Sequence, residues 1–375
     1  MRQSYLRMQF FLKKSSAKAL VATVCVLGSG TVFGQVRQNN NSLPLTYHPV
    51  APVAEAYPQS LLNFMEFETY RQRRGGYIQG NSSGENTSAE NSDADTAPAL
   101  IWSRFKAGTG SYLGETSTGG VSQDFDSWTL RSGVDGVIYE EGDQSISVGA
   151  NVIYGQGKTK VTSLHGNGSI DSYAWGIGAS ATWRGFGGMY VDVQGQTIWH
   201  TSDVSSQYLG LIAEENTGLG HSGSIEFGRQ FAFGDGFSLT PQMQMTYYWA
   251  DFQNFRDFQN TRVGLRDNTR LETRLGISAD KQFIWQGEEG DTRQAQIYGI
   301  LNLYYNMMEG TSVIVSDVEM KHEKERGWAG IGFGSSYSWG EDSYILFGEL
   351  GAKGAFQNMS DNYELNGTVR MRVKW

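Results

Sequence analysis

The sequence is poor in the residues that several common kinds of protein chemistry require. Its 375 residues include one cysteine, six prolines and five histidines. A single thiol excludes a disulfide within the chain and a cysteine metal cluster. The histidines lack the short spacing of metal ligands, and we expect no metal site, no cofactor and no enzymatic activity. These histidines are His48, His165, His200, His221 and His322.

Long apolar runs and excess positive charge are also missing. The mean hydropathy of −0.41 argues against a bundle of transmembrane helices. The formal net charge is −9, which gives no electrostatic basis for binding nucleic acid. What the chain has instead is 48 glycines and 13% aromatic residues. That composition, with few prolines, favours β structure rich in glycine and aromatic side chains.

The first 34 residues are typical of a signal peptide. Basic residues precede an apolar stretch over 19–34, and Val32 and Gly34 suit the −3 and −1 positions of a cleavage site before Gln35. The alternative is a membrane anchor, but the apolar stretch is short for a span of about 20 residues. We therefore expect passage through the secretion translocon, cleavage between Gly34 and Gln35, and loss of Cys25 with the signal.

Three short segments are expected before the main domain. Residues 35–56 form a short, irregular N-terminal segment. We expect residues 57–76 to form a helix. Pro58 can begin it, apolar residues recur every three to four positions, and two glycines end it. Residues 77–99 are a polar linker. From the pattern alone, the helix could lie on the surface of the domain or run through its interior.

Residues 100–375 contain twelve segments in which polar and apolar side chains alternate. Most are longer than the 5–6 residues of an average soluble strand and reach the about 9–11 residues that cross a membrane. The segments are 100–112, 126–139, 145–158, 172–184, 189–202, 222–233, 237–251, 270–283, 294–307, 328–339, 343–356 and 363–375.

The connections alternate between tight turns and longer polar loops. Residues 141–143 and 340–342 are turns of Gly and acidic residues, whereas 202–220, 252–269 and 308–327 are longer. Outer-membrane barrels alternate their loops in this way. The sequence therefore predicts an all-β fold, a twelve-stranded antiparallel transmembrane β-barrel of the outer membrane.

The last predicted strand is clearly two-faced. Val369, Met371, Val373 and Trp375 fall on one face, and charged residues fall on the other. Such a strand suits a wall between lipid and a polar lumen.

Polar residues on the opposite faces of other strands predict a lumen network. It is formed by Asp192, Glu226, Glu272 and Arg274. A path or clamp for an exported chain is the alternative role for these residues.

Other acidic and amide groups give no catalytic constellation. Asp251, Asp257, Asp267 and Asp280 lie near strand ends, where we interpret them as solvated loop charge and not as a protease site. Asparagines at 39–41 would suit self-cleavage inside a barrel, but they lie far upstream of the predicted helix.

Several segments, taken in order, resemble the translocator β-domain of classical autotransporters, the type V secretion proteins. Residues 69–75, Thr-Tyr-Arg-Gln-Arg-Arg-Gly, resemble the family's Thr-x-x-x-Arg-x-Gly element, and Ile101–Gly108 resembles its first strand. Further matching pieces are 190–192, 224–228, 241–247 and 273–276, followed by the terminal strand. The resemblance covers about 85% of the chain, from residue 57 to 375.

The resemblance implies a helix threaded through the lumen and residence in the outer membrane of a Gram-negative bacterium. It also implies that the barrel-assembly machinery reads Val369, Met371, Val373 and Trp375, and that an N-terminal passenger is exported. Only residues 35–56 precede the predicted helix, and we expect them to be a vestigial passenger. Two alternatives stay open: a surface barrel whose loops bind host surface molecules as an adhesin or antigen, and a simple pore.

Overall fold

The computed structural model describes residues 48–74, 100–287, 292–308, 310–340 and 342–374. The predicted signal peptide with Gly34 and Gln35, the polar linker and Trp375 lie outside the described residues. Neither of the described α-helices is long and apolar enough to cross a membrane.

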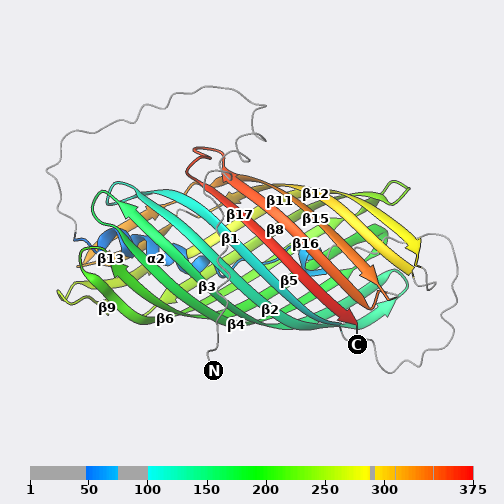
Figure 1. Ribbon diagram of the computed structural model, residues 1–375, viewed down its shortest axis with the longest axis horizontal. Coiled ribbons are helices and arrows are strands. Elements are labelled where there is room, and N and C mark those ends of the chain that lie inside the picture. The colour runs from blue at the N-terminus through cyan, green and yellow to red at the C-terminus, as the bar shows by residue number, and fades with distance from the viewer. Residues whose placement is uncertain (1–47, 75–99, 288–291, 309, 341, 375) are drawn as a thin grey trace, which may run out of the picture. The chain divides into compact units, whose positions relative to one another are not determined.

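Twelve long antiparallel strands form a closed barrel (Figure 1). Each pairs with the next along the chain, and the first pairs with the last from Leu100↔Lys374 to Ser111↔Tyr363. The predicted fold and the number of long strands are confirmed. The strands are β1(Leu100–Thr116), β2(Val121–Glu141), β3(Gln144–Ser163), β4(Gly168–Arg184), β5(Met189–Ser206), β6(Gly210–Arg229), β8(Phe237–Phe252), β11(Thr269–Gln286), β12(Thr292–Asn306), β15(Gly327–Trp339), β16(Tyr344–Ala355) and β17(Tyr363–Lys374).

Side-chain exposure alternates along these strands as the sequence predicts. On β8, Gln242 and Gln244 are 4% and 6% exposed and face the lumen, whereas Met243 is 43% exposed on the outside. Because successive side chains point to opposite faces, one strand supplies a polar lumen and an apolar outer surface. The wall therefore has the polarity that a lipid bilayer requires.

The two ends of the barrel differ. At one end, here called the turn end, lie the short β2–β3, β4–β5, β6–β8, β11–β12 and β15–β16 connections, together with Leu100 and Lys374. The short η1(Phe186–Gly188) and β7(Phe231–Ala232) belong to these turns. The opposite end is called the loop end.

The predicted long loop over 202–220 is wrong. Strand β5 continues to Ser206 and β6 begins at Gly210, and only a tight turn lies between them. The alternation persists through this stretch, since Ser202, Val204 and Ser206 are all buried. The polar composition of the stretch concealed its strand pattern.

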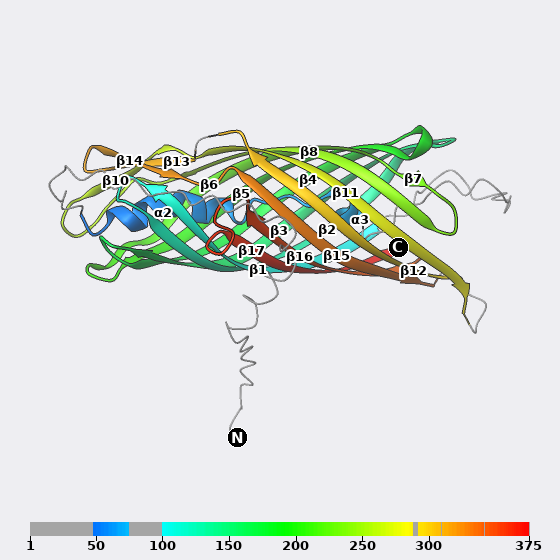
Figure 2. The same ribbon diagram turned by 90° about the horizontal axis from the view of Figure 1, so that it is seen from above.

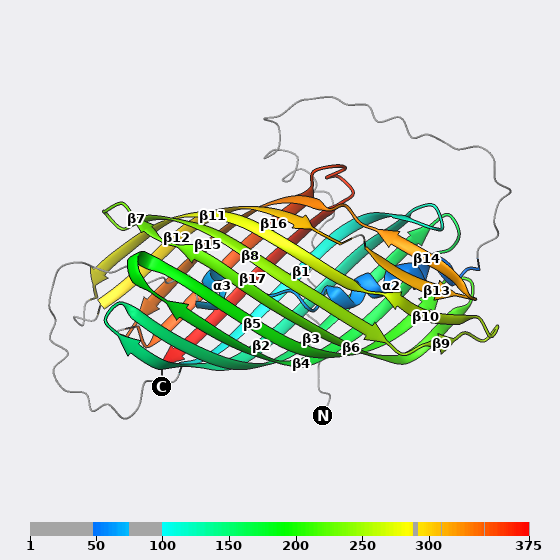
Figure 3. The ribbon, with the colours of Figure 1, turned by 180° about the vertical axis from the view of Figure 1, so that it is seen from behind.

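The other two predicted loops form a small sheet at the loop end. It contains β9(Phe255–Arg256), β10(Arg262–Asp267), β13(Thr311–Val315) and β14(Val318–Glu323). Strand β14 joins the barrel wall through two residue pairs with the end of β1, Glu115↔Glu323 and Thr116↔His322. This loop-end sheet continues the wall beside the N-terminal helix (Figure 3).

The helix inside the barrel differs from its predicted bounds. α2(Ala51–Leu62) begins six residues before Tyr57, and α3(Tyr70–Arg74) is a separate short helix. Pro58, interpreted as the start, lies inside α2, whereas Pro52 occupies the first turn. An internal proline removes a helix hydrogen bond. Close packing around α2 outweighs that loss, because every residue from Ala51 to Leu62 is buried.

Candidate functional site in the barrel lumen

The segment from residue 48 to 74, here called the plug, runs through the lumen. Helix α2 lies toward the loop end and α3 toward the turn end (Figures 1 and 2). Residues 65–69 between them are not helical. The plug therefore has an apolar part, an extended part and a basic part, and each meets a different stretch of wall.

The apolar part, α2, packs inside a ring of aliphatic side chains from the wall. Val121, Val161, Ile170 and Val204 of the long strands share one buried cluster with it, and so do Val313 and Val315 of the loop-end sheet. The ring of Tyr57 lies 4.5 Å from that of Phe252, and its hydroxyl donates to Asn216 Oδ1 at 3.0 Å. Burial of this kind stabilises by about 25 cal/mol per Å² of apolar surface.

The extended part depends on lumen side chains for its hydrogen bonds. Gln196 Nε2 donates to Met65 O at 2.6 Å, Arg131 Nη2 to Glu66 O at 2.9 Å, and Gln194 Nε2 to Glu68 O at 2.8 Å. A buried backbone carbonyl outside a helix or sheet needs such partners. The inward-facing glutamines of β5 therefore serve as a substitute for a neighbouring strand.

Two glutamates of the extended part bind cations from the first strand, β1, and from the last two strands, β16 and β17. Glu66 lies 2.6 Å from Lys106 Nζ and 3.0 Å from Lys353 Nζ. Glu68 Oε1 lies 3.0 Å from Arg104 Nε, and Glu68 Oε2 lies 3.4 Å from Arg370 Nη1.

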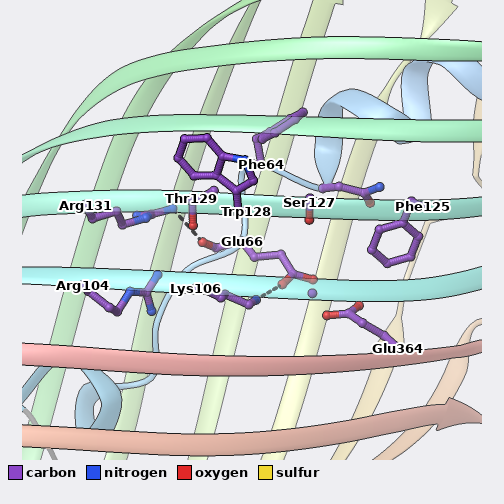
Figure 4. A pocket seen from close by; sticks show the side chains of 12 residues that line it. Phe64, Glu66, Arg104, Lys106, Phe125, Ser127, Trp128, Thr129, Arg131 and Glu364 are labelled. Atoms are coloured by element: carbon purple, nitrogen blue, oxygen red, sulfur yellow. Dashed lines mark hydrogen bonds and ion pairs between the residues drawn. The ribbon is translucent and has the colours of Figure 1, made fainter. Parts of the chain in front are cut away.

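Glu66 lies at a small cavity on the β1–β2 side, which is lined by charged side chains and by Phe64, Phe125 and Trp128. Lys106, Arg104 and Arg131 all reach into this space (Figure 4). The extended part of the plug thus lies among charged groups of both signs.

The basic part, α3, is clamped by buried carboxylates near the turn end. Arg71 forms a two-pronged ion pair with Asp280, with Nη2 at 2.9 Å from Oδ2, and its guanidinium lies 4.6 Å from the ring centre of Tyr298. Arg73 pairs with Asp192 and lies 3.6 Å from Asp135. Removal of one partner from such a pair leaves an uncompensated buried charge. This lowers the free energy of unfolding by about 3–5 kcal/mol.

Of the four residues predicted to form a lumen network, three lie together beside the plug and Glu272 lies apart from them. Asp192 and Glu226 are direct neighbours across β5 and β6, and both contact the plug. Glu226 accepts hydrogen bonds from the Tyr70 backbone N at 3.0 Å and from Tyr190 at 2.7 Å, and Arg274 lies 3.1 Å away. Glu272 instead pairs with Arg270 and has no hydrogen bond to the described plug.

Several functional residues escaped the sequence analysis. Asp280 is 1% exposed and binds Arg71, so its interpretation as solvated loop charge is wrong. Arg104 and Arg370 also went unnoticed, although both occupy lumen-facing positions in the first and last strands. The signal that could have found them is a charged residue on the polar face of a membrane strand, where a buried counter-ion is required.

The described histidines do not form a metal centre. His200 and His322 are both 1% exposed, and they lie on β5 and β14. Across the described residues, no group of three histidine, cysteine or acidic side chains could hold a metal ion.

Comparisons with known proteins agree with this architecture. Residues 101–351 match the autotransporter beta-domain family. The adhesin BmaC autotransporter of Brucella suis biovar 1 (strain 1330) is 34% identical over 88% of this chain and 10% of its own length. The probable autotransporter YfaL of Escherichia coli (strain K12) is 23% identical over 69% of this chain and 20% of its own length. The chain thus spans about a tenth to a fifth of these relatives.

Solved structures show the same fold. The transport unit of the Escherichia coli autotransporter AIDA-I superposes with a TM-score of 0.62 at 16% identity, over 86% of this chain and 99% of that one. The beta domain of the Bordetella autotransporter BrkA gives 0.58 at 16% identity, over 74% and 99%. The chain belongs to the autotransporter β-domain family, whose members are translocator barrels of the Gram-negative outer membrane.

Proposed function

We propose that the barrel carries the polypeptide preceding residue 48 across the outer membrane and then retains residues 48–74 as its plug. The observation that carries this proposal is the direction of the plug. Its first residues lie at the loop end, where a Cβ on Gly166 would be 3.2 Å from Pro49 O. Its last residues lie at the turn end, where Arg372 Nη1 donates to Arg74 O at 3.2 Å.

The orientation in the membrane follows from the unequal ends. Outer-membrane barrels have short turns on the periplasmic side and longer connections outside. The turn end is then periplasmic and the loop end external, so the chain before residue 48 emerges outside the cell.

The lumen chemistry supports passage of an extended chain. Inward glutamines and an arginine donate to the carbonyls of residues 65, 66 and 68, which are groups that every residue carries. The same donors could serve successive residues of a moving polypeptide, because every peptide unit presents the same carbonyl. Retention becomes specific when the charged side chains of the plug reach their partners. Glu66 and Glu68 meet cations of the wall, and Arg71 and Arg73 meet Asp280 and Asp192.

An epitope placed on either side of the plug tests the proposal. One variant carries the epitope between residues 40 and 46, and its matched control carries it within 77–99. In intact cells, we expect antibody to reach the first epitope only, and to reach the second after the outer membrane is permeabilised. Labelling of the second epitope alone would contradict both the orientation and the export.

Two assembly partners belong to the same proposal. The secretion translocon would take the chain by residues 1–34, with cleavage between Gly34 and Gln35. The barrel-assembly machinery would read Val369, Met371, Val373 and Trp375. In support of the second partner, Val369 and Met371 are 55% and 45% exposed on the outer wall.

The enzyme, adhesin and pore alternatives find less support. We propose no catalytic activity for the barrel, because the buried charges of the lumen hold the plug and meet one another. An adhesin role through free external loops is less favoured, because residues 202–220 continue the wall and the other two long loops fold into the loop-end sheet. Any adhesion would belong to the displayed polypeptide, and an open pore is disfavoured by the plug.

A further inference from the structure

The outer surface of the loop-end sheet carries three exposed arginines, Arg256 on β9 and Arg262 and Arg266 on β10. Val263 and Leu265 of β10 pack inward against the cluster that surrounds α2. Arg262 and Arg266 are exposed on the opposite side, and Arg266 lies at an irregularity of the β10–β13 register between Leu265 and Asp267.

The arginines are arranged without counter-ions. Arg262 lies directly opposite Arg256 in the β9–β10 register, and like charges in that position destabilise a strand pair. Arg256 Nη1 donates to Asn260 O at 3.1 Å and to Asn260 Oδ1 at 3.2 Å. Among the residues that the structure describes, none of the three arginines forms an ion pair with a carboxylate. In a chain of net charge −9, such an uncompensated group is unexpected.

A polar side chain completes the surface between the arginines. A Cβ on Gly264 would lie 2.5 Å from Asn254 Oδ1, so the glycine at this position lets the Asn254 amide lie over the strand. Asp317 and Glu319 of the β13–β14 hairpin are exposed on the same sheet and form no ion pair with the arginines. Two further exposed carboxylates have local partners. Asp267 Oδ1 accepts from Thr269 Oγ1 at 2.9 Å, and Asp251 Oδ1 accepts from the Phe252 backbone N at 2.8 Å.

The surface begins where the lipid-facing band of the barrel ends. Strand β11 starts at Thr269, just after β10, and carries Leu275 and Ile277, which are 51% and 47% exposed. On the neighbouring β12, Leu303 and Tyr305 are each 52% exposed. Aromatic residues of this kind mark the interface between lipid tails and head groups. The arginines lie beyond these residues, on the loop-end side of the start of β11, where Figure 3 shows β9 and β10.

We propose that this arginine face, formed by Arg256, Arg262, Arg266 and Asn254, binds the phosphate groups of the outer-leaflet glycolipid. A guanidinium presents paired donors that fit a phosphate, and an anion between Arg256 and Arg262 removes their repulsion. Continuity with the lipid band favours a membrane-anchored phosphate over a free one. The bound lipid would hold the loop-end sheet against the membrane surface. It would thereby stabilise the packing of this sheet against α2.

Binding of purified full-length barrel to bisphosphorylated lipid A in detergent tests this proposal. The variant Arg256→Gln/Arg262→Gln/Arg266→Gln is compared with a control that loses the same charge, Lys158→Gln/Lys160→Gln/Arg229→Gln. All three control residues are exposed elsewhere on the wall. At about 1 kcal/mol per cation near a charged lipid surface, we expect about 100-fold weaker binding for the arginine variant and little change for the control. Gel mobility before and after heating verifies that each barrel is folded.

Dephosphorylated lipid A and two soluble anions separate the possible sources of phosphate. Weak binding of dephosphorylated lipid to the wild-type barrel is the expected result. Equal binding of both lipids, or equal loss in both variants, would overturn the proposal. Displacement of lipid A by inorganic phosphate at similar concentration would assign the face to free phosphate. Preferential binding of heparin would assign it to a sulfated polysaccharide instead.

Discussion

Neighbouring side chains of the wall differ in exposure and polarity, because they lie on opposite faces of the strand. Arg104 and Arg370 are 3% and 1% exposed inside the lumen, whereas their neighbours Phe105 and Val369 are 46% and 55% exposed outside. Arginines buried in this way are stable only with counter-ions and hydrogen bonds. Glu68 of the plug is the counter-ion for both, so the plug and the wall depend on the same ionic contacts.

Replacement of Arg71 with Met should loosen the plug at the turn end. The change leaves Asp280 buried without its cation, at a cost of about 3–5 kcal/mol. We expect more frequent channel openings in planar bilayers. The double variant Arg71→Met/Asp280→Asn should restore much of the closed behaviour, because neither charge is then left alone. Arg74→Met is the control, and openings equal to wild type in Arg71→Met would contradict the role of this pair.

His322 should make the pairing between β14 and the end of β1, here called the loop-end seam, sensitive to acid. It lies opposite Thr116 where β14 joins β1, and burial lowers its pKa from 6.5 to about 4. The opened state binds the proton more tightly, so stability of the seam falls as pH drops from about 6.5 toward 4. Between pH 7.5 and 5 the loss should be about 2 kcal/mol.

Hydrogen exchange of residues 311–323, corrected for intrinsic rates, measures this effect. The variant His322→Gln keeps a polar side chain next to Gln123 but has no titrating group, and its protection should be nearly independent of pH. The same pH dependence in both proteins would refute the assignment.

Among the elements, α2 depends most on its surroundings. Its twelve residues contain two prolines, and an isolated helix of this length is marginal in water. Its formation follows from enclosure by β2, β3, β4, β5, β8 and the loop-end sheet. The loop-end sheet depends on α2 in turn, because Val263, Val313 and Val315 bury their side chains against the same cluster.

Substitution of Gly168 with Leu should displace α2. A Cβ at Gly168 would lie 2.2 Å from Ser205 O and 2.5 Å from Val53 Cγ2. Overpacking of this kind lowers the free energy of unfolding by about 1–3 kcal/mol. Gly195→Leu on the outer face of β5 is the matched control, because a Cβ there meets no atom within 4 Å.

A cysteine at Ala54, in a chain with Cys25→Ser, reports the position of α2. We expect an impermeant maleimide to label it in intact cells much faster in Gly168→Leu than in Gly195→Leu. Equal rates would mean that α2 does not depend on this contact.

The whole molecule is closed by one pairing of distant strands. Twelve residue pairs join β1 to β17, and this removes the exposed edges that an open sheet would present. Closure brings Arg104 and Arg370 into the same register, so they can share one carboxylate of the plug.

Substitutions on the two faces of the last strand should have unequal effects on assembly. Met371→Asp and Trp375→Asp place charge on the predicted assembly face, whereas Lys374→Asp alters the opposite face. We expect the first two variants to reach the outer membrane at several-fold lower levels, as measured by cell fractionation. Equal levels of all three variants would refute the assignment of Val369, Met371, Val373 and Trp375 as an assembly signal.

The sequence by itself determined the number of long strands, their two faces and the polarity of the lumen. These features depend on a two-residue period that neighbouring side chains express locally. Tertiary structure decided which charges meet. Arg71 and Asp280 are 209 positions apart, and only closure and register place them together. It also decided the bounds of α2 and the folding of two predicted loops into a sheet, because enclosure of apolar surface outweighed local proline and polar composition.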